Sequence, residues 1–103
     1  MAIQDVIKDQ VTKNKVVLYM KGTADFPQCG FSSNACSILR ACGVEDFHTV
    51  NVLEDADIRS GIKEYANWPT IPQLYVNGEF VGGSDIMMEM YKSGELLKVL
   101  QQG

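Results

Sequence analysis

The sequence predicts an α/β fold in which five helices cover a four-stranded mixed sheet. A helical period, a short apolar run, a second helical period and a second β-rich run follow one another, which is the order of a parallel crossover unit. The dipeptide Asn77 and Gly78, between two further β-rich runs, predicts a hairpin and therefore an antiparallel pair. The chain has 103 residues, of which 46% are hydrophobic and 21% charged. This size and composition are typical of one globular domain, which we place at residues 1–103.

Each element follows from hydrophobic periodicity or from β-propensity. We expect helices where apolar side chains recur every three to four residues, and strands where short runs are rich in β-branched and aromatic residues. In chain order, the expected elements are a helix over 3–11, a strand over 16–20, a helix that carries Ala35 to Cys42, a strand over 47–52, a helix over 55–66, strands on either side of Asn77 and Gly78, and helices over 85–92 and 95–101.

Residues that favour helix ends frame two of these helices. Either Ser32 or Ser33 is expected to cap the second helix, and Gly43 is suited to end it. Ser84 is expected to cap the helix that follows the hairpin. The loop residue Cys29 therefore stands just before a helix N-terminus.

Charge and composition exclude several classes of function. The net charge is −4 and the nine basic residues are scattered, which argues against binding of a nucleic-acid backbone. No apolar run is long enough to span a bilayer, and the start, MAIQDVIKDQ, is amphipathic and acidic, so we expect no secretory or transit segment. Three cysteines do not suggest a disulfide scaffold. We expect a reducing compartment, the bacterial cytoplasm or, alternatively, a mitochondrial matrix after removal of a presequence.

The cysteine in the stretch PQCGFS is the main candidate for chemistry. A redox motif of two cysteines would place the second one at Ser32. A thiol at a helix N-terminus meets the positive end of the helix dipole and unpaired backbone N–H groups, so we expect the pKa of Cys29 to be lowered. The alternative is a buried cysteine without a chemical role. We assign that structural role to Cys36 and Cys42, which fall within the helical run.

Two other segments have a chemical and a structural interpretation. The glycine turn from Gly82 to Asp85 leads into a helix, whose open N–H groups can hold a carboxylate or phosphate, or it is only a hairpin exit with a cap. Pro72 precedes a strand, where its peptide bond is either cis or that of an ordinary strand-entry proline.

Four motifs together resemble one known family. KGT at 21–23, PQCGFS at 27–32, NWPTIPQ at 67–73 and NGEFVGGSD at 77–85 occur in the order seen in the monothiol glutaredoxins of the CGFS type. The resemblance covers nearly the whole chain. It implies a thioredoxin-like fold, glutathione as ligand, and a role in the assembly and transfer of iron–sulfur clusters.

The resemblance also implies a set of site residues. Cys29 would ligate iron and face the sulfur of glutathione. The remaining residues would bind glutathione or shape its site: Lys21 and Arg59, helped by Lys63, at the glycine carboxylate; Thr70, Ile71 and Pro72 at the cysteine backbone, with Pro72 cis in the family; Gly83, Ser84 and Asp85 at the γ-glutamyl end; and Phe31 at the wall beside the cluster.

Ligand counting suggests what a single cysteine can do. A [2Fe-2S] cluster usually needs four thiolates, which two chains and two glutathione molecules would supply. We therefore expect a homodimer when the cluster is bound, a monomer without it, and acceptor or scaffold proteins as partners. One alternative is a glutathione-dependent thiol-disulfide oxidoreductase in which Cys29 attacks a glutathionylated protein, an activity we expect to be weak at most. Another is an interaction module without a ligand.

Overall fold

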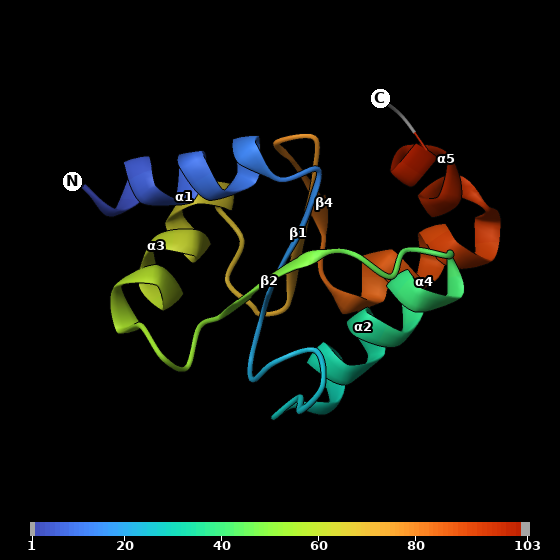
Figure 1. Ribbon diagram of the computed structural model, residues 1–103, viewed down its shortest axis with the longest axis horizontal. Coiled ribbons are helices and arrows are strands. Elements are labelled where there is room, and N and C mark those ends of the chain that lie inside the picture. Colours follow the sequence, from blue (N-terminus) through green and yellow to red (C-terminus); the bar gives the residue numbers. More distant parts are fainter. Residues whose placement is uncertain (1, 102–103) are drawn as a thin grey trace.

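The computed structural model describes residues 2–101. In it, a mixed sheet lies between two groups of helices (Figure 1). Within this range the chain forms four strands and five helices: α1 (Ile3–Lys13), β1 (Val16–Met20), α2 (Gly30–Ala41), β2 (His48–Asn51), α3 (Ala56–Ala66), β3 (Gln73–Val76), β4 (Glu79–Gly82), α4 (Ser84–Ser93) and α5 (Glu95–Gln101). The predicted fold class and the predicted order of elements are both confirmed.

The sheet has the strand order β2-β1-β3-β4. Strands β1 and β2 are parallel, with Leu18 opposite Thr49, whereas β1 pairs with β3 and β3 with β4 in the antiparallel sense. The predicted hairpin joins β3 to β4, and both turn residues have positive φ, 52° at Asn77 and 81° at Gly78. This is the backbone that an Asn-Gly turn favours between twisted strands.

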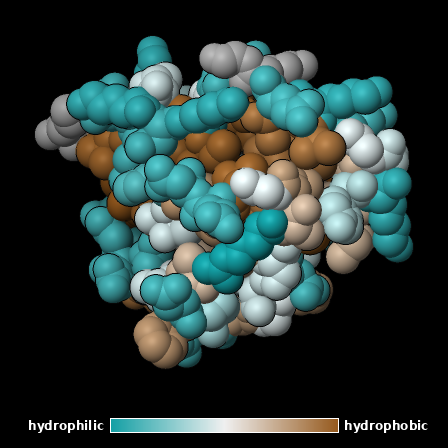
Figure 2. Space-filling view, turned by 45° about the vertical axis from the view of Figure 1, so that its right-hand side comes forward, coloured by the Kyte–Doolittle hydropathy of each residue, from teal (hydrophilic) through white to brown (hydrophobic). Residues whose placement is uncertain are grey.

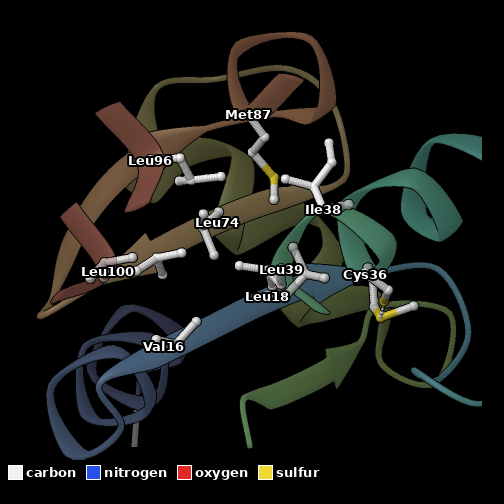
Figure 3. Packing of buried hydrophobic residues seen from close by; sticks show 12 residues of the cluster. Val16, Leu18, Cys36, Ile38, Leu39, Leu74, Met87, Leu96 and Leu100 are labelled. Atoms are coloured by element: carbon white, nitrogen blue, oxygen red, sulfur yellow. Dashed lines mark hydrogen bonds between the residues drawn. The ribbon is translucent and has the colours of Figure 1, made fainter. Parts of the chain in front are cut away.

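The central strand β1 is buried on both faces and therefore contributes to two hydrophobic cores. Its even-numbered residues face α2, α4 and α5, and Figure 3 shows Val16 and Leu18 directed toward the aliphatic side chains of these helices. Val17 and Tyr19 face the other core, formed with α1 and α3. Figure 1 shows the same division, with α1 and α3 on one side of the sheet and α2, α4 and α5 on the other.

Cys36 lies inside the first of these cores, as expected for a structural cysteine. Its side chain is only 1% exposed, and its thiol is 3.6 Å from the sulfur of Met20 (Figure 3). Cys42 is half-buried at the end of α2 and packs against the same core. Burial raises the pKa of both thiols, which keeps them protonated and unreactive near neutral pH.

Helix starts differ from the prediction at two places. Helix α2 begins at Gly30 with Cys29 as its N-cap, so neither Ser32 nor Ser33 caps it. Helix α4 begins at Ser84, and the N-cap is Gly83. In both helices the expected serine lies inside the helix, and neither N-cap residue makes a side-chain capping hydrogen bond.

Other boundaries lie within two residues of the prediction, and the largest shift is at the end of α1, which runs to Lys13 and not to residue 11. Asp55 caps α3, and its carboxylate accepts hydrogen bonds from the N–H groups of Asp57 (2.9 Å) and Ile58 (3.2 Å). Gly94 ends α4 in the left-handed conformation. Strand β2 is shorter than the predicted 47–52 by one residue at each end.

The surface around α4 and α5 is mostly hydrophilic. With this side turned forward, Figure 2 shows hydrophilic side chains over most of the face and a band of hydrophobic side chains between them in its upper part. Within residues 2–101, no helix combines the length and the apolar character that crossing a membrane requires.

Candidate functional site

A hollow of about 370 Å³ lies beside Cys29, and we call it the cysteine pocket. It is formed by the end of β1, the first turns of α2 and α4, one face of α3 and the loop before β3. Its lining residues are Lys21, Cys29, Phe31, Arg59, Lys63, Trp68, Pro69, Thr70, Ile71, Pro72, Gly83, Ser84, Asp85 and Ile86. The pocket therefore joins segments from both halves of the chain.

All eleven site residues that the family resemblance implied lie at this pocket, and three further residues were missed. The missed residues are Trp68, Pro69 and Ile86. Trp68 was interpreted only as a packing residue, and its ring does pack against Phe80, with the ring centres 5.6 Å apart. Its position within the motif NWPTIPQ, two residues before the assigned Thr70, was the signal that could have identified it.

Cys29 combines access to solvent with an environment that favours its thiolate. It is half-buried as the N-cap of α2, with an extended backbone at φ −152° and ψ 137°. The backbone N–H of Ser32 lowers the pKa of Cys29 most, the N–H of Phe31 and the charge of Lys21 act in the same direction, and burial opposes them. These donors are the open N–H groups of the first helical turn, which a sulfur anion accepts far better than a neutral thiol does.

Ser32 replaces the second cysteine of a redox motif and has a structural task of its own. Its side chain is fully buried, and its hydroxyl oxygen accepts a hydrogen bond of 3.1 Å from the backbone N–H of Lys21. The same hydroxyl contributes to lowering the pKa of Cys29. Ser32 thus connects the thiol to the end of β1, which explains why it does not act as a helix cap.

The backbone next to Lys21 is held from several directions. The carbonyl of Lys21 accepts from the N–H of Gln28 (2.9 Å), and the N–H of Gly22 donates to the side-chain oxygen of Asn51 at the end of β2 (3.0 Å). The N–H of Leu53 donates to the same oxygen at 3.0 Å. These bonds fix the root of the Lys21 side chain beside Cys29.

The loop over residues 68–72, which we call the pocket loop, forms one wall. It follows Asn67, which ends α3 in the left-handed conformation at φ 52°, and the N–H of Trp68 donates to the carbonyl of Lys63 at 3.0 Å. The peptide bond between Ile71 and Pro72 is cis. The sequence left the isomer of this bond open, and the structure assigns it.

The start of α4 faces the pocket loop at close range. A Cβ atom on Gly83 would lie 3.2 Å from the carbonyl oxygen of Pro72 and 3.4 Å from the indole nitrogen of Trp68. Glycine at this position therefore allows the helix N-terminus to approach the loop. Because no side chain caps α4, the N–H groups of its first turn are available to an anion.

Charge and chemistry distinguish the cysteine pocket from a second hollow of about 250 Å³. That hollow lies between the β3–β4 hairpin and the last two helices, and among the described residues that line it only Glu79 is ionisable. The cysteine pocket has three cationic side chains, one carboxylate and one thiol. Its arrangement can bind a small anionic molecule next to the thiol of Cys29.

The three thiols are expected to react at different pH values. Iodoacetamide should modify Cys29 first near pH 7, because its pKa is lowered whereas burial raises those of Cys36 and Cys42. Peptide mapping by mass spectrometry after timed labelling from pH 5 to 10 would measure each rate. In urea the three thiols should titrate together, and a midpoint for folded Cys29 at or above that common value would contradict the expectation.

The lowered pKa of Cys29 also gives the sign of its effect on stability. A folded-state pKa below the unfolded one means that the unfolded chain binds more protons between the two values. The contribution to stability is therefore fully present above the unfolded thiol pKa of about 8.5, and it is lost as the pH falls through the folded value.

Comparisons with known proteins agree with one another. The Glutaredoxin family model matches residues 16–81. A relative described as an uncharacterised monothiol glutaredoxin, from Synechocystis sp., is 62% identical over 95 residues, which cover 92% of this chain and 88% of that protein. Mitochondrial monothiol glutaredoxin-5 of Lachancea kluyveri is 53% identical over 95% of this chain and 70% of its own length. The solution structure of reduced poplar apo GrxS14 has a TM-score of 0.83 at 52% identity, over 95% of this chain and 93% of that one.

A mixed sheet of this topology, with a thiol at the N-terminus of α2 beside a cis-proline loop, defines the glutaredoxin class of thioredoxin-like proteins. Within this class, the two named relatives are monothiol glutaredoxins, and the CGFS stretch of this chain likewise contains a single cysteine. The chain belongs to the monothiol glutaredoxins. The resemblance that the four motifs suggested is confirmed.

Proposed function

We propose that this chain binds glutathione in the cysteine pocket and, as a homodimer, carries a [2Fe-2S] cluster to acceptor or scaffold proteins. One observation carries the proposal. An accessible thiol with a lowered pKa faces a pocket that also contains three cations and an uncapped helix N-terminus. This combination is complementary to a small acidic molecule that brings its own thiol.

The three cationic side chains of the pocket are the proposed binding partners of one end of glutathione. Lys21, Arg59 and Lys63 come from two different segments, yet they line one pocket in a chain whose net charge is −4. A carboxylate bound there would form charge-assisted hydrogen bonds, which are stronger than neutral ones. We assign the glycine carboxylate of glutathione to this group.

The first turn of α4 is the proposed binding partner of the other end of glutathione, the γ-glutamyl residue. The open N–H groups of Ser84 and Asp85 suit the α-carboxylate of the γ-glutamyl residue, and the side chain of Asp85 suits its ammonium group. Gly83 allows this helix end to lie close to Pro72. Between the two ends, the backbone of Ile71, next to Thr70, is the proposed partner of the glutathione cysteine, whose sulfur would then point toward Cys29.

Ligand counting favours a cluster shared between two chains. Within residues 2–101, no three His, Cys, Asp or Glu side chains lie close enough together to hold a metal ion. In this proposal each chain supplies Cys29 alone, and two chains with two glutathione molecules supply the usual four sulfur ligands. Phe31, which is 59% exposed beside Cys29, would cover one side of the cluster. Because two ligands are exchangeable, the cluster is cargo that the protein can release.

The lowered pKa of Cys29 also supports a second candidate, a glutathione-dependent oxidoreductase. In that reaction the thiolate of Cys29 attacks the glutathionyl sulfur of a mixed disulfide and releases the substrate thiolate. A second glutathione then attacks the sulfur bound to Cys29, which yields glutathione disulfide and regenerates the thiolate. We expect this activity to be weak at most.

Anaerobic reconstitution with iron, sulfide and glutathione tests the proposal. We expect a coloured dimer by visible absorption and native mass spectrometry, and we expect it to bleach and become monomeric when glutathione is removed. A colourless monomer that still binds glutathione in calorimetry would favour the oxidoreductase. A colourless monomer that does not bind glutathione would favour an interaction module.

The proposed setting is a reducing compartment, since all three cysteines are free. The relatives named above are a cyanobacterial and a mitochondrial protein. We propose the bacterial cytoplasm as the location, with the mitochondrial matrix as the alternative.

A further inference from the structure

Gln73 is a fully buried polar residue directly after the pocket loop. It is the first residue of β3, and its side chain is 0% exposed. Its amide nitrogen donates to two carbonyls of the pocket loop, those of Trp68 at 3.1 Å and Thr70 at 3.2 Å. A buried side-chain amide that satisfies two loop carbonyls is well placed to determine the shape of that loop.

The orientation of this amide is fixed from the other side. The hydroxyl of Tyr75 donates to the side-chain oxygen of Gln73 at 3.0 Å. Burial raises the pKa of Tyr75, so the hydroxyl keeps its proton. Turning the amide over would point its oxygen at two carbonyl oxygens and its nitrogen at a donor, so only one orientation satisfies all three bonds.

We propose that Gln73 is a positioning residue, whose carboxamide, held by the Tyr75 hydroxyl, fixes the pocket loop in the conformation that receives glutathione. In addition to the bonds made by the Gln73 amide, a hydrogen bond from the Trp68 N–H to the Lys63 carbonyl holds the beginning of the loop. Gln73 itself does not line the pocket. Its effect on ligand binding, which rests on the function proposed above, therefore acts through the loop backbone next to Ile71.

A matched pair of variants separates positioning from general stability. Gln73→Met keeps the length of the side chain but removes both donated hydrogen bonds and the acceptor for Tyr75. Gln10→Met is the control, because the side-chain oxygen of Gln10 accepts from the hydroxyl of Tyr19 at 2.6 Å in the same way. Tyr19 and Tyr75 are packed edge to face with ring centres 5.6 Å apart, so each change removes the glutamine partner of a tyrosine hydroxyl in one aromatic cluster.

Two readouts are needed, one without ligand and one with it. Trp68 is the single tryptophan of the chain and belongs to the pocket loop, so its fluorescence and its quenching by acrylamide report the loop in the ligand-free protein. Calorimetry at a temperature where each variant is folded measures the affinity for glutathione. We expect Gln73→Met to expose Trp68 to the quencher and to weaken binding by about tenfold. Gln10→Met should leave both readouts within about twofold of the unchanged protein.

The outcomes distinguish this proposal from the proposed function. Equal quenching and equal affinity in the Gln73 and Gln10 variants would overturn the positioning role. If the unchanged protein fails to bind glutathione, the proposed function fails, and a quenching change confined to Gln73→Met would still support the positioning of the loop. Should Gln73→Met not fold, Tyr75→Phe and its control Tyr19→Phe repeat the comparison. A change in Trp68 quenching for Tyr75→Phe alone supports the proposal, and equal behaviour contradicts it.

Discussion

Replacing Cys29 by serine is expected to abolish the visible absorption of the reconstituted protein and to leave it monomeric. Within residues 2–101 no other cysteine lines the pocket, and a serine hydroxyl does not ionise to a metal ligand at neutral pH. The fold should persist, since Cys29 is a half-buried N-cap residue that belongs to neither hydrophobic core. Absorption spectra and native mass after anaerobic reconstitution measure the effect.

Cys42→Ser is the matched control for this experiment. Cys42 lies at the opposite end of α2, half-buried and outside the pocket. The Cys42→Ser variant should therefore still become coloured and dimeric on reconstitution. Retained colour in Cys29→Ser, or loss of colour in Cys42→Ser, would show that the cluster is not held as proposed.

Gly22→Ala is expected to have the largest effect on stability among glycine substitutions near the site. Gly22 has φ +88°, and a Cβ atom there would lie 2.5 Å from the carbonyl oxygen of Phe26 and 2.6 Å from the backbone nitrogen of Gln28. Both are backbone atoms, so the loop itself must open. We expect a loss of about 2–4 kcal/mol in the free energy of unfolding, measured by urea denaturation.

A second glycine provides the control for backbone strain alone. Gly43 has φ +83°, nearly the same value, but a Cβ atom there would meet nothing within 4 Å. Gly43→Ala should therefore cost only about 1 kcal/mol, the penalty for a left-handed alanine. Equal losses for the two variants would mean that the close approach at Gly22 contributes little.

The local sequence was sufficient for the strands and for most helix boundaries. A short apolar run predicted β1 with its observed bounds, and Asn77 with Gly78 predicted the hairpin, because turn conformation depends on the turn residues themselves. Asp55, the first residue of the helix predicted over 55–66, caps α3, where its carboxylate meets N–H groups two and three residues ahead. Such interactions involve only neighbours in the chain.

The caps predicted at Ser32 and Ser84 were wrong for a non-local reason. Ser32 accepts its hydrogen bond from the backbone N–H of Lys21, which directly follows β1 and is eleven residues away in the chain. Gly83 takes the N-cap position of α4, where a larger residue would press on Pro72 and Trp68. A capping rule considers only the residues of one helix end, so it cannot include either constraint.

From neighbouring residues alone it follows that the chain is an α/β domain with a hairpin, and that its thiol in CGFS stands at the start of a helix. The shape of the candidate site depends instead on packing. Arg59 and Lys63 line the same pocket as Cys29, and Gln73 reaches back to Trp68, because β1, α3 and β3 are brought together around a shared hydrophobic core. Motifs predicted which residues belong together, but burial and hydrogen bonds between distant segments decide what each of them holds in place.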